Sequence, residues 1–174
     1  DGNYLWNITC IDPSGNTNSS VNRVFTIDNQ PVTFISLTTR PTSYVDLDPN
    51  VNVTIFANIT DNVTAISTVI FQYKLNSDNT YSNITMNFNS GDQLYNTSFN
   101  ATTEGIYNLR IWANDTVDNK DFSAPINISV FFDKNWTRSP AVFTVVTGEL
   151  NKNISIGNLT INNSGDFALE FNIT

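Results

Sequence analysis

Apolar and polar residues alternate along most of this chain of 174 residues. Every odd position from Val51 to Ile59 is apolar, whereas the even positions are polar apart from Phe56. Successive side chains of a β-strand point to opposite faces, so such a run predicts a strand with one buried and one solvated face. The same alternation returns over residues 69–75, 84–88, 107–113 and 126–132. No stretch shows an apolar stripe with the 3.6-residue period of a helix, and the chain is therefore predicted to be all-β.

An internal repeat relates the beginning of the chain to residues after position 104. At a constant offset of 103 residues, Asp1-Gly2-Asn3-Tyr4 aligns with Glu104-Gly105-Ile106-Tyr107. Further along, the same offset brings together four more pairs: Ile8 with Ile111, Cys10 with Ala113, Asp12 with Asp115, and Asn16 with Asn119. The offset matches the length of one immunoglobulin-type β-sandwich, about 100 residues.

The repeat divides the chain into three units. We expect residues 1–29 to be the closing hairpin of a truncated immunoglobulin-like domain and residues 30–134 to be a complete β-sandwich. Residues 135–174 are expected to be the opening strands of a third sandwich, with a turn at 162–166 and strands over 141–146, 153–161 and from 167 onward. A lone hairpin exposes unpaired edges and half a core. The chain is therefore expected to be a fragment of a longer protein, or a subunit that its neighbours complete.

The motif Asp/Glu-Gly-x-Tyr, an alternating strand ending in Cys or Ala, and Asp-x-x-x-Asn resembles the tandem immunoglobulin-like repeats of prokaryotic surface proteins. The abundance of Asn and Thr is similar to that of archaeal cell-surface and S-layer-type proteins, and the stretch 158–165 resembles opening strands of related modules. One departure is Asp118, which stands where the first copy has Gly15. The resemblance implies an extracellular scaffold or adhesin without catalytic residues.

The repeated residues have direct structural interpretations. Tyr4 and Tyr107 are placed to form a tyrosine corner, in which the hydroxyl bonds to backbone at the edge of a sandwich. Asp12 and Asp115 open a loop, where an Asx-turn is the natural role of an aspartate. Cys10, the single cysteine, is expected to be a small buried residue on a strand.

Charge and composition exclude several classes of function. The net charge is −8, and the eight basic residues are scattered, which argues against binding to nucleic acid. The chain has no histidine, and no nucleophile elbow, phosphate loop or CxxC pair, so we expect no enzymatic activity. No apolar run reaches the length of about 20 residues that spans a membrane, so direct membrane insertion of this segment is not expected.

Asparagine, threonine and serine (28, 22 and 15 residues) replace the missing charge and form fifteen Asn-x-Ser/Thr sequons, where composition alone predicts about six. Alternation also generates Asn-Ile-Thr, which is a structural alternative, although asparagine is disfavoured in strands. N-linked glycans are the favoured interpretation and imply an exported protein. The sequons are at Asn7, Asn18, Asn52, Asn58, Asn62, Asn83, Asn96, Asn100, Asn114, Asn127, Asn135, Asn153, Asn158, Asn162 and Asn172.

Two loops collect carboxylates. Asp46 and Asp48 lie in one, and Asp115, Asp118 and Asp121 lie in another. Oxygen ligands at a junction between domains can bind Ca²⁺ and stiffen it. Turn formation is the stronger interpretation of both loops, because Asp-Pro and Asp-x-x-Asp are common in turns.

Three tryptophans, Trp6, Trp112 and Trp136, are candidates either for stacking on sugars or for packing at junctions. The register of the strand directs Trp112 away from Leu109 and Ile111, toward the outside. Packing is the favoured interpretation, and a platform for sugars is the alternative.

These features favour a structural, extracellular cell-surface protein built from β-sandwich repeats as a rod, lattice or filament. Its expected partners are other copies of itself or other surface proteins. One alternative is a filament subunit that assembles by β-strand complementation. Another is an adhesin or carbohydrate-binding module with glycans as partners.

Overall fold

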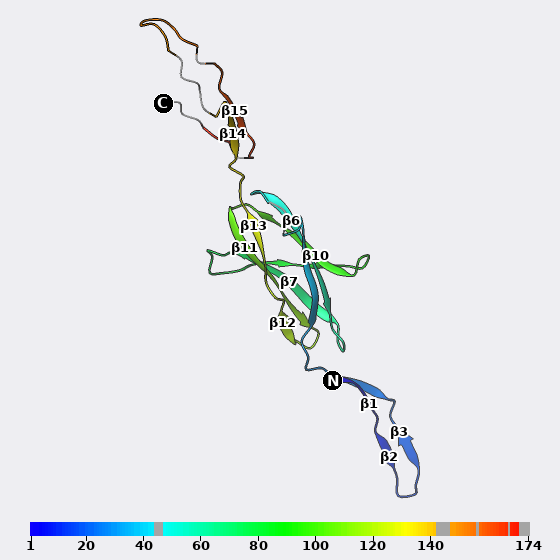
Figure 1. Cartoon of the computed structure of the whole chain (residues 1–174). Helices are drawn as coiled ribbons and strands as arrows, with labels where there is room; N and C mark the ends of the chain where they lie inside the picture. Colours follow the sequence, from blue (N-terminus) through cyan, green and yellow to red (C-terminus); the bar gives the residue numbers. More distant parts are fainter. Residues whose placement is uncertain (44–46, 142–146, 156, 167, 171–174) are drawn as a thin grey trace.

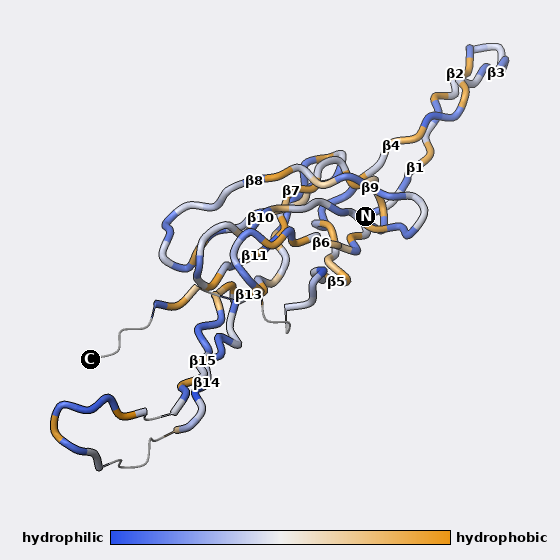
Figure 2. Tube along the Cα trace, turned by 90° about the horizontal axis from the view of Figure 1, so that it is seen from above, coloured by the Kyte–Doolittle hydropathy of each residue, from blue (hydrophilic) through white to orange (hydrophobic). Residues whose placement is uncertain are grey.

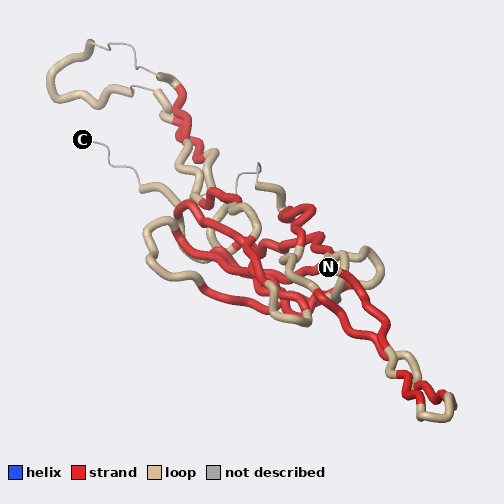
Figure 3. Tube along the Cα trace, turned by 90° about the horizontal axis from the view of Figure 1, so that it is seen from below, coloured by secondary structure: helices blue, strands red, loops and turns tan. Residues whose placement is uncertain are grey.

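The fold of the chain was obtained as a computed structural model, which describes all residues except 44–46, 142–146, 156, 167 and 171–174. The described residues form strands and loops, with no helix among them (Figure 3). The predicted all-β class is therefore confirmed. Accordingly, the described residues include no helix that is long and apolar enough to cross a membrane.

Two antiparallel sheets lie face to face in the middle of the chain. The first has the order β5-β6-β10-β9, made of Thr33–Arg40, Val51–Thr60, Leu94–Ala101 and Asn87–Asn89. The second has the order β12-β11-β7-β8, made of Lys120–Phe122, Gly105–Asp115, Ile66–Leu75 and Ser82–Thr85. Strand β13 (Ile126–Val130) also pairs with β11, next to its first half. The arrangement is a β-sandwich.

The core fills the space between the two sheets and follows the predicted alternation. Val53, Ile55 and Ala57 of β6 are fully buried, and they belong to the same cluster as Leu109 and Ile111 of β11. Aromatic side chains complete the cluster: the ring of Phe99 contacts those of Phe71, Tyr73 and Tyr107, and the rings of Phe71 and Tyr73 stack on each other. Burial of apolar area at about 25 cal/mol per Å² makes this cluster the main stabilising feature of the chain.

The first 29 residues form a hairpin that projects from one end of the sandwich (Figure 1). Its stem pairs β1 (Gly2–Trp6) with β4 (Arg23–Ile27), and its outer part pairs β2 (Thr9–Ile11) with β3 (Thr17–Ser19). Hydrophobic residues, orange in Figure 2, recur along this hairpin beyond the sandwich.

A second two-stranded sheet projects from the opposite end of the sandwich (Figure 1). It pairs β14 (Trp136–Ser139) with β15 (Thr160–Asn163). The predicted strand over 153–161 is wrong for most of its length, because Thr160 and Ile161 alone among its described residues are in a strand. Among the described residues, no second sheet buries the apolar side chains here, such as Leu150 with 90% of its surface exposed, so they gain little from pairing.

The turn predicted at 162–166 begins later than expected, because β15 continues to Asn163. The amides of Ser164 and Gly165 both donate to the carbonyl of Asn135, which closes the turn. Two other predicted strands lie largely outside the described residues. The first was predicted over 141–146, of which 142–146 are not described, and the second from 167 onward, of which 167 and 171–174 are not described.

Candidate functional site

The opening hairpin and the hairpin β11–β12–β13 have the same pairing at an offset of 103 residues. Gly2 pairs with Ile27 in the first, and Gly105 pairs with Val130 in the second. The outer parts correspond as well, as Cys10 pairs with Asn18 and Ala113 with Asp121. The two segments are therefore the same structural unit in two settings.

Hydrogen bonds outside the strand pairing are also duplicated. The amide of Ile8 donates to the Ser20 hydroxyl at 3.0 Å, and the amide of Ile111 donates to the Ser123 hydroxyl at 2.9 Å. At the base of each hairpin a carboxylate accepts from the chain on the other side. Asn29 N–H donates to Asp1 at 3.1 Å, and Phe132 N–H donates to Glu104 at 3.1 Å.

The loop at the tip of each hairpin is organised by one aspartate. Asp12 Oδ1 accepts from the amides of Ser14 and Asn16 at 2.9 Å each, and the Asn16 side chain donates to Asp12 Oδ2 at 2.7 Å. This is the predicted Asx-turn, extended by a second bond from the asparagine. Gly15 in this loop has a φ of 85°, in the left-handed region that glycine adopts without strain.

Asp115 organises the second loop in the same way. Its Oδ1 accepts from the amides of Val117 and Asn119, and its Oδ2 accepts from the Asn119 side chain, all at 2.9 Å. Asp118 occupies the position of the glycine and has a φ of 68°, so the departure noted in the sequence keeps the left-handed backbone. The Asp-x-x-x-Asn motif is thus a loop-closing device in both copies.

Burial distinguishes the two aspartates. Asp12 is exposed, and its pKa is lowered because the side chain and amide of Asn16 stabilise the charged form. Asp115 has only 1% of its surface exposed. Burial raises the pKa of Asp115, but the bonds from Asn119 and Val117 outweigh it and leave the pKa below the ordinary value.

Tyrosine and cysteine positions of the two hairpins show the same contrast between an exposed first copy and a buried second copy. Tyr107 is 5% exposed, and its hydroxyl bonds to both the amide and the carbonyl of Thr103, as a tyrosine corner does. Tyr4 is 44% exposed. The expectation that Cys10 is buried is wrong: it is exposed, because no second sheet of the described part of the chain covers the opening hairpin, whereas its counterpart Ala113 is fully buried.

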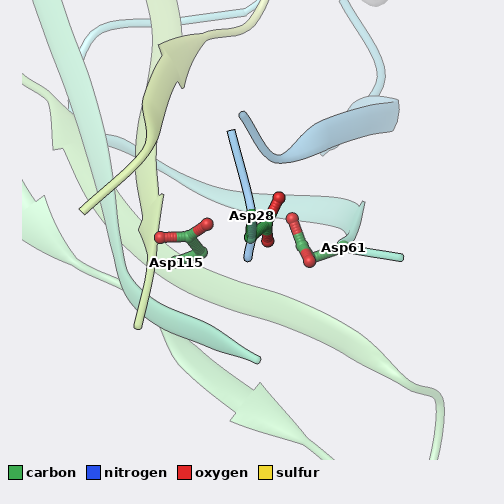
Figure 4. A group of neighbouring side chains, drawn as sticks. All are labelled: Asp28, Asp61 and Asp115. Atoms are coloured by element: carbon green, nitrogen blue, oxygen red, sulfur yellow. The ribbon is translucent and has the colours of Figure 1, made fainter. Parts of the chain in front are cut away.

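Three carboxylates meet where the hairpin joins the sandwich (Figure 4). Asp28 follows β4, Asp61 follows β6, and Asp115 ends β11, and their ligand oxygens lie within 4.8 Å of one another. The Thr64 hydroxyl donates to Asp28 at 2.9 Å, and the Asn119 side chain donates to the Asp28 carbonyl at 3.1 Å. The junction is thus joined by hydrogen bonds across three segments of the chain.

A hollow of about 590 Å³ lies beside this cluster. Its lining includes Asp28, Asp61 and Asp121, together with the apolar Val32 and Phe122. Carboxylate oxygens at this spacing have the chemistry that Ca²⁺ prefers, and the predicted calcium site at a domain junction stays a prediction.

The structure separates the acids that the sequence singled out. Asp46 lies outside the described residues, and Asp48 is exposed at the opposite end of the sandwich, next to the bridge between Leu47 and Val130. Asp118 is exposed and lies 3.8 Å from Lys120. Of the predicted acids, only Asp115 belongs to the cluster.

Sequence reasoning missed Asp28 and Asp61 as neighbours of Asp115. Asp61 bonds the amides of Val63 and Thr64, so locally it is an ordinary turn aspartate. Each of the three acids lies at or just after the end of a strand, but β4, β6 and β11 belong to three different sheets, so no strand pairing predicts that these ends meet.

A second polar cluster covers the outer face of the sheet that contains β11. The Arg110 guanidinium lies between two rings, 4.1 Å from the centre of Tyr81 and 4.3 Å from that of Phe122. Its Nε donates to Gln72 at 2.9 Å. Trp112 pairs with Phe122 across the strands and is half-buried, on the predicted outer face.

The other two candidates for stacking on sugars, Trp6 and Trp136, lie outside the sandwich on β1 and β14, at 42% and 45% exposure.

The fourteen sequon asparagines that the structure describes are exposed or half-buried, Asn172 being outside the described residues. Asn58, Asn96 and Asn114 are half-buried, and the Asn114 side chain donates to Asp118. Asn52 and Asn100 are direct partners across β6 and β10. Their accessibility is compatible with glycosylation and also with the structural alternative.

No protein-family model matches the chain, and no curated protein matches it. Among solved structures, the chain is similar to a carbohydrate-binding module of family 56, a β-1,3-glucan-binding domain. The TM-score is 0.34 and the sequence identity 18%, over 53% of this chain and 96% of that one. A likeness this remote carries no inference about ligands.

Proposed function

We propose that the chain is a structural, extracellular repeat protein of a cell surface, built from immunoglobulin-like β-sandwiches arranged in series. The observation that carries the proposal is the duplicated hairpin, which reproduces pairing register, loop bonds and base contacts at an offset of 103 residues. Proteins built from serial copies of one self-contained unit usually serve as extended scaffolds, in which the number of copies determines the length of the molecule.

The outer surface suits such a role. Bonded polar pairs such as Thr54 with Ser98 cover the outside of the first sheet. Sequons at Asn52 and Asn100 lie on the same face. Neutral polar side chains, and glycans attached to them, keep exposed sheets from pairing with other chains. We propose that the sequons carry N-linked glycans and that the protein is exported, without a catalytic role.

Two measurements on the source cells test the proposal. An antibody raised against residues 30–134 is expected to label intact cells, and the natively purified protein is expected to have a mass above that of its polypeptide. Labelling that requires permeabilised cells contradicts the extracellular assignment. A mass equal to that of the polypeptide contradicts glycosylation and leaves the location to the labelling.

A second candidate function is binding of carbohydrate through the outer face around Arg110. Aromatic rings beside planar polar groups are suited to stack on and hydrogen-bond with sugars, and Phe122, at 45% exposure, is accessible there. If this function is correct, binding on a glycan array is lost in Trp112→Ala and Phe122→Ala. Phe56→Ala, on the outer face of the other sheet, serves as the matched control. Binding that survives both changes, or a chain that is silent across the array, speaks against it.

A further inference from the structure

The opening hairpin carries an apolar face that the described part of the chain leaves uncovered. We call this the inner face, because its residues are the counterparts of core residues in the sandwich. Its members, all exposed, are Tyr4, Trp6, Ile8, Cys10, Phe25 and Ile27. At an offset of 103 their counterparts, all buried, are Tyr107, Leu109, Ile111, Ala113, Ile128 and Val130.

The sandwich shows what covers such a face. Tyr107 lies 5.8 Å from Phe99 of β10, ring centre to ring centre. Val53 and Ile55 of β6 belong to the same buried cluster. The covering layer is therefore a sheet whose inward positions are aliphatic or Phe and whose outward positions are neutral and polar. No charged residue is required of it on the inward side.

We propose that the inner face binds an antiparallel sheet of the same design as residues 30–103, joined directly to Asp1, and that the two complete a second sandwich. This inference rests on the proposed function in one respect, since it takes residues 1–29 as the closing hairpin of a repeat. It adds which structure covers the inner face and where in the chain that structure is connected.

The tyrosine corner indicates the point of entry. Tyr107 bonds to the backbone of Thr103, four residues earlier in the chain. The corresponding partner of Tyr4 falls on the residue immediately before Asp1. Gly2 already has the backbone of its counterpart, with a φ of 140° against 145° at Gly105. Asp1 likewise reproduces the bond that Glu104 makes at the base of the hairpin.

A second copy of the chain is a poorer occupant. Its own sheet of this design, β5-β6-β10-β9, is already covered by β7 and β11. What its described residues leave open is its own opening hairpin and the pair β14–β15, and each of these two-stranded sheets is narrower than the four-stranded sheet over the central hairpin. A continuous sheet ahead of Asp1 has the required width and connection.

The test extends the full chain with a second copy of residues 30–103 placed directly before Asp1. Cys10, the single cysteine of the parent chain, reports on the inner face, because a buried thiol reacts only when the structure opens. We expect a thiol reagent to label Cys10 at least about tenfold more slowly in the extended protein than in the parent. The tryptophan emission, to which Trp6 contributes beside Trp112 and Trp136, is expected to shift to shorter wavelength.

A control places the thiol on the other face of the same hairpin. Thr26 pairs with Asn3 on the side opposite to Phe25, and its counterpart Ser129 is exposed in the sandwich. The double variant Cys10→Ala/Thr26→Cys is therefore expected to react equally fast with and without the extension. Slowing at both positions would indicate general occlusion instead of a specific sheet interface.

The rings of Trp6 and Phe25 are larger than Leu109 and Ile128, and overpacking destabilises a core. A second extended protein with Trp6→Leu and Phe25→Ile restores the volumes of the central core.

The proposal is overturned if Cys10 stays as reactive as in the parent in both extended proteins while the added segment is protease-sensitive. It is also overturned if Cys10 of the parent alone becomes protected as its concentration rises, which would identify a second copy as the occupant. Neither outcome bears on cell-surface location or glycans, so failure of the interface is distinguishable from failure of the proposed function.

Discussion

Asp12 and Asp115 make the same set of loop bonds, but only Asp115 makes them inside a folded domain. Replacing Asp115 by Ala leaves the amides of Val117 and Asn119 without an acceptor. A hydrogen bond to a charged group contributes about 1.5–3 kcal/mol, so we expect the free energy of unfolding to fall by about 2–4 kcal/mol. Urea denaturation measures it. Asp12→Ala is the matched control and is expected to leave the unfolding of the sandwich unchanged.

The lowered pKa of Asp115 predicts an acid sensitivity. A carboxyl group whose pKa is lower in the folded than in the unfolded state stabilises the fold above the unfolded value, here 3.8. That contribution is lost as the pH falls through the folded pKa. Thermal unfolding followed from pH 7 down to about pH 2 is expected to show a decline below about pH 4 that is smaller in Asp115→Asn. An identical decline in the variant would assign the acid sensitivity to other carboxylates.

The two tyrosines provide a comparison at a single oxygen atom. The Tyr107 hydroxyl makes two bonds to Thr103, and Tyr107→Phe removes both without changing the packing of the ring. At about 0.5–1.5 kcal/mol per bond, a loss of about 1–3 kcal/mol is expected in chemical denaturation. Tyr4→Phe is expected to change the value by less than about 0.5 kcal/mol, because Tyr4 lies outside the sandwich core. A similar loss from both variants would contradict this account of the corner.

At the scale of the elements, two hairpins with identical pairing differ in what lies behind them. An isolated two-stranded hairpin is marginally stable in water, whereas β11 is covered by a second sheet. We therefore expect backbone amides of β1 and β4 to exchange with deuterium at least about a hundredfold faster than the matching amides of β11 and β13. Hydrogen-exchange mass spectrometry on the full chain compares them directly. Equal protection would mean that strand pairing alone stabilises the hairpin.

Alternation did not single out β5, β10 or β12. It predicted the strands β6, β7, β11 and β13, because each of them has one face buried by the other sheet. The run Val51–Thr60 is a strand over its whole length for this reason. The same rule failed at Cys10 and at residues 153–155 and 157–159, where the described residues leave the apolar side uncovered. Alternation of apolar and polar residues predicts which face of a strand is suited to burial. It does not predict whether a second sheet is present to cover that face.

The loop at Asp115 was predictable because its bonds are local, reaching only to Asn119. The meeting of Asp28 and Asp61 with Asp115 was not, because it depends on how the hairpin leaves the sandwich. Contacts between residues this far apart in sequence are set by tertiary packing, for which a single sequence offers no signal.

At the scale of the molecule, tension applied to the two ends of the chain enters the sandwich at β5 and leaves it at β13, and these strands lie in different sheets. Extension of the sandwich therefore requires either separation of β5 or β13 from its own sheet or sliding of one sheet past the other. A parallel bridge between Leu47 and Val130 opposes this sliding, supported by the Phe131 amide, which donates to the Leu47 carbonyl at 2.9 Å. Leu47 is buried, which adds side-chain packing at the same point.

We therefore expect Leu47 to contribute more to the force needed to unfold the sandwich than its contribution to the free energy of unfolding would suggest. Leu47→Ala and Met86→Ala both truncate buried side chains, and each is expected to lower the free energy of unfolding by about 2–5 kcal/mol. Met86 lies between β8 and β9, away from the strands that bear the load. When the chain is pulled from its ends in an atomic force microscope, Leu47→Ala is expected to reduce the unfolding force clearly more than Met86→Ala. If the force follows thermodynamic stability equally in both variants, the bridge has no mechanical role, and resistance to tension is a property of the whole core.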